Sequence, residues 1–421
     1  MEVKRLQAYK FELMPNGANL RGMRQYAGAR RFVFNKALAL SQRYYRRFKR
    51  TAGYVNLANQ LPKWKKLHPF LKEAPSQVLQ QSLKDLDKAY VNFFKGNTDF
   101  PTFKKKSQGG GFRYPQGCEL DQPNSRIKLP KIGWVQYRNS RAVEGLVKNV
   151  TLSSKSNRWF MSVQTERAVV QEVHPATTSI GIDVGITRFA TLSDETFFAP
   201  LNSFKKNQLK LSKYQRQFSR KKKFSKNWLK AKCKITQLHT DIANARLDFL
   251  HKTSTIISKN HAMIFVEDLQ VSNMSKSSKG TVESPGKKVK QKSGLNRSIL
   301  DQGWGEFRRQ LEYKSNWTGG ECMAVPPKNT SRTCPCCRHI SGDNRKTQSM
   351  FLCVECGYTN NADVVGAINV RTKGLKILEG QDTIDDSIGR IKTVAQLAYQ
   401  VNGAVIPSAI RTHRSDLSLT V

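Results

Sequence analysis

Four cysteines in the C-terminal third of the chain have the spacing of a metal site. The first pair is Cys334 and Cys337, the second pair is Cys353 and Cys356, and 15 residues lie between the pairs. Zn²⁺ binds four thiolates in a tetrahedron, and each C-x2-C turn presents two of them to one ion. Four thiolates leave no open position, so we expect one structural zinc. Cys336 is an extra thiol, but only Cys334 and Cys337 have two residues between them.

Three acidic residues that are far apart in the chain form a second candidate site. Asp183 lies between apolar residues in a predicted strand, where an unpaired charge is costly. Glu267 ends a short apolar segment, and Asp363 begins the helix-like run ADVVGAINV. Each alone is a weak signal, because an acid at a helix start is commonly a cap. Asp268 is the alternative to Glu267, since strand alternation does not decide which of two adjacent side chains points inward.

Together, these carboxylates suit a site for hard cations. Mg²⁺ prefers oxygen ligands, and side chains converging from two strand ends and a helix can hold two ions about 3.5–4 Å apart. Such ions stabilise the attacking water and the leaving oxygen during hydrolysis of a phosphodiester. The order strand-Asp, strand-Glu, helix-Asp therefore favours metal-dependent phosphodiester chemistry.

The elements that would position these residues follow from the apolar pattern. Residues 179–194 and 261–269 have the composition of buried strands, and each segment carries one of the acids. Residues 205–258 are basic with helical spacing, which predicts a helical hairpin. Residues 275–294 are rich in Ser, Gly and Lys and predict a mobile loop. An apolar helix should follow the cysteines through about Thr372.

The N-terminal half has a different pattern of apolar and polar residues from the C-terminal half. Residues 1–14 and three segments between about 126 and 165 have strand character, and helical spacing dominates the interval that follows the first strand. This pattern predicts an antiparallel, β-barrel-like unit that is completed by the N-terminal strand and interrupted by a helical insertion. The last 50 residues have weak periodicity, and we expect a poorly ordered tail.

The charge of the chain indicates a polyanionic partner. With 72 Lys and Arg against 31 Asp and Glu, the 421-residue chain has a formal net charge of +41. Residues 13–72 contain 14 basic and no acidic residues, and residues 196–240 contain 13 basic and no acidic residues. Ordinary surfaces mix both signs, so these tracts predict contacts with phosphates. No apolar run approaches the roughly 18 residues of a membrane span, which favours nucleic acid over a membrane.

Three motifs resemble a known family. The segments GIDVGI, IFVEDL and NADVVGAIN, with the cysteine cluster just before the last, resemble the split RuvC-like nuclease of the TnpB family. Members of this family are RNA-guided DNA endonucleases encoded by insertion sequences and are similar to type V CRISPR effectors. The stretches NRSILDQGWGEFRRQLEYK and TSRTC fit as well, so the resemblance covers about residues 178–372. The basic N-terminal half fits more loosely.

The resemblance implies an α/β fold with β-barrel and helical parts. An RNase H-like (RuvC-like) nuclease domain would bind two Mg²⁺ ions through Asp183, Glu267 and Asp363 and would contain an inserted zinc ribbon. The expected domains are a split β-barrel wedge (1–14 and 110–172), a helical recognition lobe (15–109), a first nuclease part (178–326) with the hairpin and a lid-like loop, the zinc ribbon (327–360), the last nuclease helix (361–372) and a flexible tail (373–421).

The implied function is RNA-guided cleavage of target DNA beside a short adjacent motif. The partners would be a transposon-derived, omega-type guide RNA, double-stranded target DNA and its displaced strand, with no membrane and no small-molecule cofactor. The N-terminus lacks a signal-peptide core, so we expect a cytoplasmic protein. The resemblance implies a prokaryotic protein associated with the nucleoid. Two alternatives are a nuclease-inactive RNA-guided repressor and a conventional transposase.

Overall fold

The computed structural model of this chain describes residues 2–380, which fall into two compact units. The first unit ends at Val170 and the second begins at Gln171. Each unit has its own sheet and its own hydrophobic clusters. Residues 381–421, which make up most of the tail expected from the sequence, lie outside the described residues.

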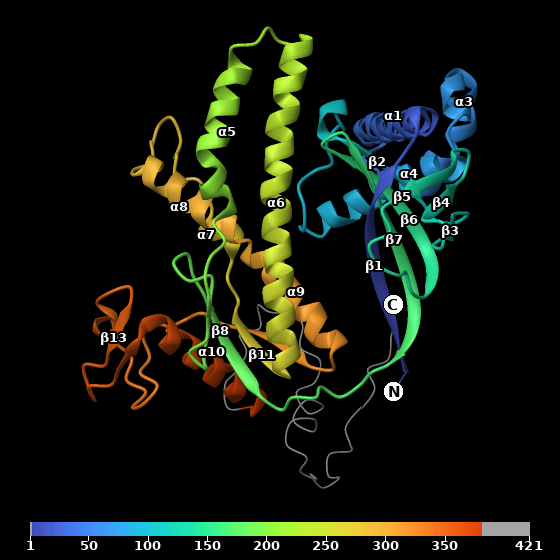
Figure 1. Ribbon diagram of the computed structural model, residues 1–421. Helices are drawn as coiled ribbons and strands as arrows, with labels where there is room; N and C mark the ends of the chain where they lie inside the picture. Colours follow the sequence, from blue (N-terminus) through green and yellow to red (C-terminus); the bar gives the residue numbers. More distant parts are fainter. Residues whose placement is uncertain (1, 381–421) are drawn as a thin grey trace, which may run out of the picture. The chain divides into compact units, whose positions relative to one another are not determined.

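The first unit is built on one antiparallel sheet of seven strands, in the order β2-β6-β7-β1-β5-β4-β3 (Figure 1). The strands are β1 (Glu2–Met14), β2 (Gly110–Tyr114), β3 (Glu119–Asp121), β4 (Arg126–Leu129), β5 (Gly133–Tyr137), β6 (Leu146–Lys155) and β7 (Arg158–Val170). In β1, Tyr9, Phe11 and Leu13 alternate with more exposed residues and enter the core. The N-terminal strand thus pairs with segments more than 100 residues away.

This sheet is open, which corrects the expectation of a β-barrel. β2 and β3 are its edge strands, and within residues 2–380 they pair with β6 and β4 rather than with each other. β3 has only three residues, too few to close a barrel. Helices α1 (Gly17–Phe48) and α4 (Ser76–Phe94) pack against β2 instead. Closure depends on pairing between distant strands, which local alternation does not encode.

Helices fill the interval between β1 and β2. The shorter ones are α2 (Tyr54–Ala58), α3 (Leu61–Leu67), η1 (Pro69–Lys72) and η2 (Lys106–Gln108). α1 and α4 bury apolar stripes at helical spacing, and these stripes share the hydrophobic core of the unit. An ion pair of 2.7 Å between Arg30 and Asp85 joins the two helices beside that core.

The second unit is built on a five-stranded sheet in the order β10-β9-β8-β11-β12. The strands are β8 (Ser179–Val184), β9 (Ala190–Leu192), β10 (Phe197–Phe198), β11 (Met263–Glu267) and β12 (Glu321–Val325). β8, β11 and β12 run parallel, while β9 and β10 add antiparallel neighbours. Parallel strands need long crossovers. These are formed by α5 (Ser203–Ser219) and α6 (Lys226–Asn260), and then by α7 (Val271–Met274), α8 (Val289–Gln302) and α9 (Trp304–Trp317).

Alternation along β8 and β11 separates two hydrophobic clusters on the two faces of this sheet. Ile182 and Val266 belong to a cluster with residues of α6 and α9. Phe265 points the other way and belongs to a cluster with Val370 and Ile377 of α10 (Ala362–Leu378). The sheet therefore lies between α6 and α9 on one face and α10 on the other.

Helix α10 packs closely on the sheet because glycines lie at the contact. A Cβ atom on Gly181 of β8 would overlap with the backbone of Ala367, and one on Gly374 of α10 would overlap with the ring of Phe265. Neither position accepts a side chain unless α10 moves away from the strands. Gly181, the first glycine of the motif GIDVGI, is thus required for α10 to pack closely against β8.

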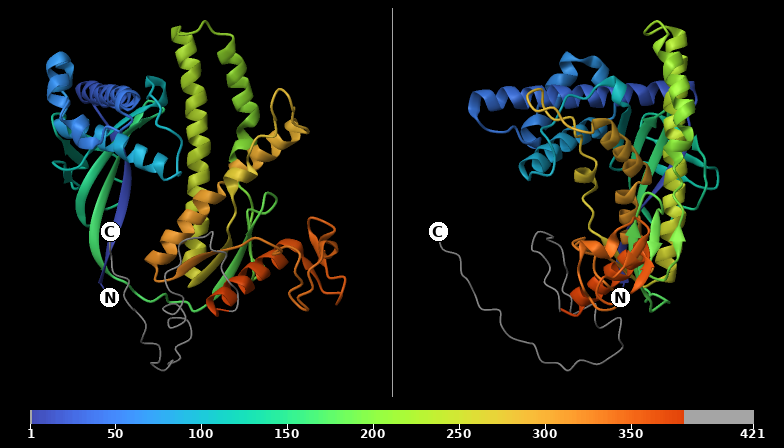
Figure 2. Two further views of the ribbon diagram at one scale, coloured as in Figure 1. Left: turned by 180° about the vertical axis from the view of Figure 1, so that it is seen from behind. Right: turned by 90° about the vertical axis from the view of Figure 1, so that its left-hand side faces the viewer.

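Helices α5 and α6 form a long antiparallel hairpin (Figure 1, Figure 2). Asp301, near the end of α8, is buried and anchors its base. Its carboxylate accepts hydrogen bonds from the hydroxyl of Ser203 at 3.1 Å and the amide of Phe204 at 3.0 Å, and it lies 3.7 Å from Arg246 of α6. This buried acid therefore has a structural role.

Two element boundaries differ from the sequence expectation. Helix α8 begins at Val289, so the end of the predicted loop 275–294 is helical. Helix α10 continues to Leu378, beyond its expected end at Thr372. No helix in residues 2–380 combines the length and the hydropathy that crossing a lipid bilayer requires.

Candidate active site and metal centre

Asp183 and Glu267 occupy neighbouring positions on adjacent parallel strands. The register of β8 and β11 places Ile182 beside Val266, and the next residue of each strand is the acid. Neighbouring strands lie about 4.8 Å apart, and side chains at matching positions of parallel strands point to the same face. Both carboxylates therefore share the face of Phe265, which α10 covers.

Asp268 points to the opposite face. Its carboxylate is ion-paired with the guanidinium of Arg308 on α9. Because α9 covers the other side of the sheet, the two adjacent acids are separated by the strand itself. Of the two residues that the sequence left open, Glu267 is the one beside Asp183.

Asp363 reaches the same face from the first turn of α10. The side chain of Asn361 caps the helix and accepts hydrogen bonds from the amides of Asp363 at 3.0 Å and Val364 at 3.4 Å. An acid in the first helical turn is favoured by the helix dipole. One turn later, a Cβ atom on Gly366 would lie 2.8 Å from Oδ2 of Asp183. Glycine at this position leaves room for the Asp183 carboxyl group against α10.

Glu267 and Asp363 are close enough to Asp183 to affect the ionisation of its carboxyl group. Burial, and then the charges of Glu267 and Asp363, raise the pKa of Asp183 to about 8. Burial also raises the pKa of Glu267, which a hydrogen bond from Thr330 partly offsets. Half-buried carboxyl groups that lie close to one another favour binding of a cation.

Arg345 supplies a positive charge at this group. Its Nη2 lies 3.2 Å from Oδ1 of Asp363, and the two side chains are 19% and 22% exposed. The same guanidinium opposes the rise in the pKa of Asp183 and of Glu267. Sequence reasoning missed Arg345, because nothing local distinguishes it among 72 basic residues.

Two buried polar residues connect Glu267 to α10. The hydroxyl of Thr330 donates a hydrogen bond of 2.5 Å to Oε1 of Glu267. Asn369 of α10 donates to the carbonyl oxygens of Thr330 and Thr333, at 2.8 and 2.7 Å. Both residues lie in motifs that carried the family resemblance, TSRTC and NADVVGAIN, which is the signal that could have identified them.

The four predicted cysteines meet in one cluster, and their Sγ atoms all lie within 4.8 Å of one another. The Sγ atoms of Cys334 and Cys356 are 3.6 Å apart, as are those of Cys337 and Cys353. A tetrahedron with Zn–S bonds of about 2.3 Å separates its sulfurs by about 3.8 Å. The cluster therefore fits a four-thiolate zinc site. Cys336 is exposed and outside the cluster.

Each cysteine pair lies on the same kind of turn. The amide of Arg338 donates to the carbonyl oxygen of Cys334, and that of Gly357 donates to Cys353, both at 3.0 Å. Arg338 and Gly357 have φ values of 66° and 70°. The β13–β14 hairpin (Met350–Leu352 and Thr359–Asn361) then leads directly into α10. The cysteine cluster is thus joined by a short hairpin to the start of the helix that carries Asp363.

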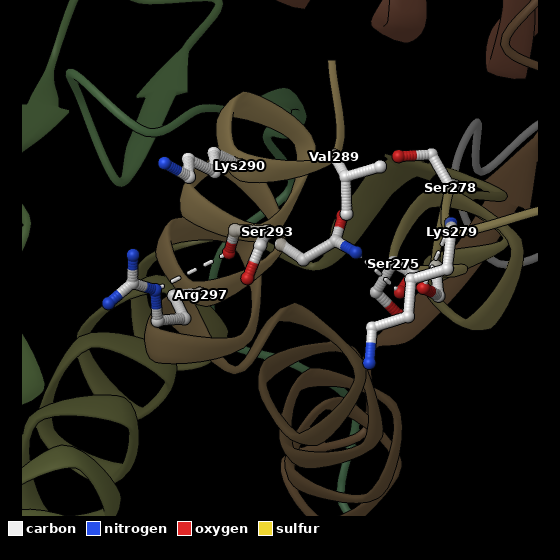
Figure 3. A pocket seen from close by; sticks show the side chains of 9 residues that line it. Ser275, Ser278, Lys279, Val289, Lys290, Ser293 and Arg297 are labelled. Carbon is white, nitrogen blue, oxygen red and sulfur yellow. Dashed lines mark hydrogen bonds between the residues drawn. The ribbon is translucent and has the colours of Figure 1, made fainter. Parts of the chain in front are cut away.

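The region of the predicted loop 275–294 encloses a pocket of about 570 Å³ (Figure 3). Its lining consists of Ser275, Ser277, Ser278, Lys279, Val289, Lys290, Ser293, Asn296 and Arg297. Asn296 of α8 donates a hydrogen bond of 2.9 Å to the carbonyl oxygen of Ser275, which ties the loop to the helix. The lining is basic and rich in hydroxyl groups, so it is compatible with an anionic group.

Three segments of the chain match known families. Residues 160–278 match the family OrfB_IS605, described as "Probable transposase", residues 304–370 match "Cas12f1-like, TNB domain", and residues 1–50 match "Helix-turn-helix domain". Over 378 residues, the chain is 56% identical to "Putative RNA-guided DNA endonuclease InsQ" of Escherichia coli (strain K12), covering 89% of this chain and 94% of that protein. This chain belongs to the TnpB family.

Other matches are more distant. A "Putative RNA-guided DNA endonuclease" of Streptomyces pristinaespiralis is 32% identical to this TnpB-family chain over 382 residues, covering 89% of this chain and 90% of the relative. A Cas12f1-sgRNA-target DNA complex aligns at a TM-score of 0.49 and 14% identity, covering 84% and 82% of the two chains. Residues 1–50, matched as a helix-turn-helix, contain strand β1 and one long helix here.

Proposed function

We propose that this TnpB-family chain is an RNA-guided DNA endonuclease that hydrolyses phosphodiester bonds of target DNA at the carboxylate site. The observation that carries the proposal is the convergence of Asp183, Glu267 and Asp363 from two parallel strands and one helix, with the half-buried Asp183 packed against α10. Relatives named as RNA-guided DNA endonucleases match this chain over most of their length and support the same activity.

Mg²⁺ is the cofactor that suits these residues, since carboxylate oxygens are its preferred protein ligands. In residues 2–380 the three acids do not form as tight a group as the cysteines. Two Mg²⁺ ions would be held by Asp183, Glu267 and Asp363, because a pair of ions can use ligands that are further apart than those of a single ion. When bound, the ions would activate water and stabilise the leaving oxygen. The chain itself holds Glu267 through Thr330 and Asp363 through Asn361.

The finer domain assignments belong to the same proposal. The nuclease part would be RNase H-like (RuvC-like), with β8 and β11 supplying the first two acids, and the cysteine segment would be an inserted zinc ribbon. One structural Zn²⁺ would hold Arg345 and the start of α10 in place. We assign residues 178–326 and 361–372 to the nuclease, 327–360 to the ribbon, 1–14 and 110–172 to an open-sheet wedge, 15–109 to a recognition lobe, and 275–294 to a lid.

The proposed partners are an omega-type guide RNA derived from the transposable element, double-stranded target DNA and the displaced strand. The two acid-free tracts, residues 13–72 and 196–240, support binding to phosphates in any sequence. Base pairing with the guide would supply sequence specificity. The place of action would be the prokaryotic nucleoid.

The conventional transposase is the second candidate, because two family descriptions name a transposase and a helix-turn-helix. The observed strand and single long helix in residues 1–50 weaken it. A nuclease-inactive repressor is weaker still, because such a protein should have lost an acid, and all three are present.

The decisive experiment is to purify the full chain, sequence any RNA that remains bound, and reprogram its guide segment. Cleavage of plasmid DNA with a randomised flanking sequence would then be measured with Mg²⁺. We expect cleavage only where the new guide pairs with the target. A protein that carries no discrete RNA and cuts at transposon ends would be a conventional transposase, whereas guided binding without cleavage would identify a repressor.

A further inference from the structure

The turn between α5 and α6 contains an aromatic residue in an unfavourable backbone conformation. Phe224 has a φ of 67°, in the left-handed region that bulky residues rarely adopt. Its side chain is 71% exposed. Glycine or asparagine would adopt this conformation with less strain. The turn uses the left-handed conformation at this position but does not require an aromatic side chain there, so Phe224 combines backbone strain with exposed apolar surface.

Phe224 is the most exposed of three neighbouring rings. Its centroid lies 5.5 Å from that of Trp228, which lies 4.8 Å from that of Phe218, and the latter two rings are half-buried. Nζ of Lys223 lies 5.4 Å from the centre of the Phe224 ring, and Nζ of Lys232 lies 5.4 Å from that of Trp228. The tip of the hairpin thus carries a cluster of aromatic rings in contact with lysine ammonium groups.

The charge around these rings is entirely positive in sequence. Residues 196–240 include no acidic residue. The exposed basic residues nearest the turn are Arg216, Arg220, Lys221, Lys222, Lys223, Lys226 and Lys230. Aromatic rings within a cationic surface are the combination that binds unpaired nucleic acid, because the rings stack on bases while the cations neutralise phosphates.

A purely local role for Phe224 accounts less well for these contacts. Ser225 caps α6 by accepting a hydrogen bond of 3.1 Å from the amide of Trp228. An apolar residue just before such a cap often packs against the fourth helical residue, here Leu229, and stabilises the helix start. Leu229 is itself 53% exposed, and the ring contact of Phe224 is with Trp228.

We propose that Phe224 and Trp228 form a stacking platform for an unpaired base of the RNA that this protein binds. This assignment rests on the RNA partner proposed above. RNA presents unpaired bases in loops and bulges, and proteins commonly stack such bases on aromatic side chains. Intact duplex DNA keeps its bases stacked inside the helix, so it offers no free base to this platform.

The test uses the full-length protein, freed of bound RNA, and fluorescence anisotropy with three labelled probes. One probe is an RNA stem–loop with an unpaired loop, the second is a blunt RNA duplex of equal length, and the third is a single-stranded DNA. Phe224→Asn removes the ring but tolerates the left-handed backbone, whereas Phe224→Tyr keeps the ring. Leu209→Ala is the matched control, because Leu209 is an exposed, non-aromatic residue of α5. Lys221→Ala reports on phosphate contacts.

We expect Phe224→Asn to bind the stem–loop roughly tenfold more weakly, with an unchanged salt dependence and an unchanged affinity for the blunt duplex. Phe224→Tyr and Leu209→Ala should keep the wild-type affinity. Lys221→Ala should instead reduce the salt slope, by about 0.7–0.9. The melting temperature of Phe224→Asn should equal or exceed that of the wild type, because the substitution relieves strain.

Three results would overturn the proposal. The first is wild-type RNA affinity in Phe224→Asn, with or without a lower melting temperature, which would indicate a local helix-stabilising role. The second is an equal loss in Phe224→Tyr. The third is a loss for single-stranded DNA but not for the RNA stem–loop, which would make DNA the occupant. Failure of the wild-type protein to bind either RNA probe is a separate outcome that would also remove the proposed RNA partner.

Discussion

Arg345 and Asp363 form an ion pair of 3.2 Å that links the cysteine-rich segment to the acidic group. The arginine comes from the short helix η3 (Gly342–Arg345), and the aspartate comes from the first turn of α10. A cation that is part of the chain therefore already lies beside the acids. A divalent ion that binds there has to share Asp363 with the guanidinium or displace it.

Replacing Arg345 with alanine should strengthen Mg²⁺ binding and lower the stability of the metal-free protein. Without the guanidinium, the three carboxylates repel one another more strongly, and a divalent cation relieves that repulsion. We expect roughly tenfold higher Mg²⁺ affinity, about 1.4 kcal/mol, together with a lower melting temperature in EDTA. Calorimetric Mg²⁺ titration measures the first. Arg309→Ala, which breaks a surface ion pair with Glu306 on α9, is the control and should leave the affinity unchanged.

Neutral amide variants of the three acids should abolish cleavage without abolishing guided DNA binding. Asp183→Asn, Glu267→Gln and Asp363→Asn each remove a ligand charge, and we expect at least a thousandfold slower cleavage, about 4 kcal/mol in the barrier. Single-turnover cleavage and gel-shift assays measure the two activities. Asp268→Asn is the matched control, because its side chain faces Arg308, and its cleavage rate should stay near wild type. A fully active Glu267→Gln would remove Glu267 from the site.

The metal-free protein should lose stability as the pH rises towards 8. The pKa of Asp183 is raised from 3.8 to about 8, so between these values the native state keeps a proton that the unfolded chain releases. This contribution is fully present below about pH 4, decreases by at most about 1.4 kcal/mol per pH unit and is lost above about pH 8. Urea unfolding in EDTA should show this decrease for the wild type and less of it for Asp183→Asn. If the free energies of unfolding of the wild type and of Asp183→Asn depend on pH in the same way, this prediction is wrong.

A methyl group on Gly366 should disturb the site through Asp183. The added Cβ would lie 2.8 Å from the Asp183 carboxylate, so either α10 or the acid has to move. We expect Gly366→Ala to reduce cleavage at least tenfold and to lower stability by about 1–3 kcal/mol. Gly305→Ala on α9 is the control, because a Cβ there meets no atom within 4 Å. It should be neutral or slightly stabilising, and an equally harmless Gly366→Ala would contradict the packing argument.

Loss of zinc should inactivate the enzyme from a distance. Cys353→Ser removes one thiolate from the cluster, and we expect loss of bound zinc, a stability loss of several kcal/mol and loss of cleavage, because Arg345 and the start of α10 are no longer held. Cys336→Ser should retain one zinc per chain and wild-type cleavage, because Cys336 lies outside the cluster. Elemental analysis and cleavage assays check both. Retention of zinc in Cys353→Ser would contradict the ligand assignment.

The sequence predicted best what depends on a few adjacent residues. A C-x2-C turn is local, so the spacing identified all four cysteines and excluded Cys336. The choice between Glu267 and Asp268 could not be made in the same way. It depends on the register of β11 against β8 and on Arg308, which is 40 residues further along the chain.

Strand pairing over long sequence distances and left-handed backbone conformations could not be predicted from the sequence. Local alternation identified the strands of the first unit, but the barrel was wrong because the edge strands β2 and β3 do not meet. Arg345 is one of many basic residues until tertiary structure places it beside Asp363. Phe224 reads as an ordinary aromatic residue, because its left-handed backbone follows from the hairpin turn and not from its residue type.

The opposite orientations of Glu267 and Asp268 matter for protein engineering. Two consecutive acids on the same face would repel each other. Here Glu267 and Asp268 point to opposite faces of the strand, and Arg308 neutralises the charge of Asp268. Grafting this centre onto another scaffold by copying only the three acids would leave Asp268, or whatever replaces it, facing a foreign layer without a counter-charge. A transplant should therefore include the arginine-bearing helix behind the sheet.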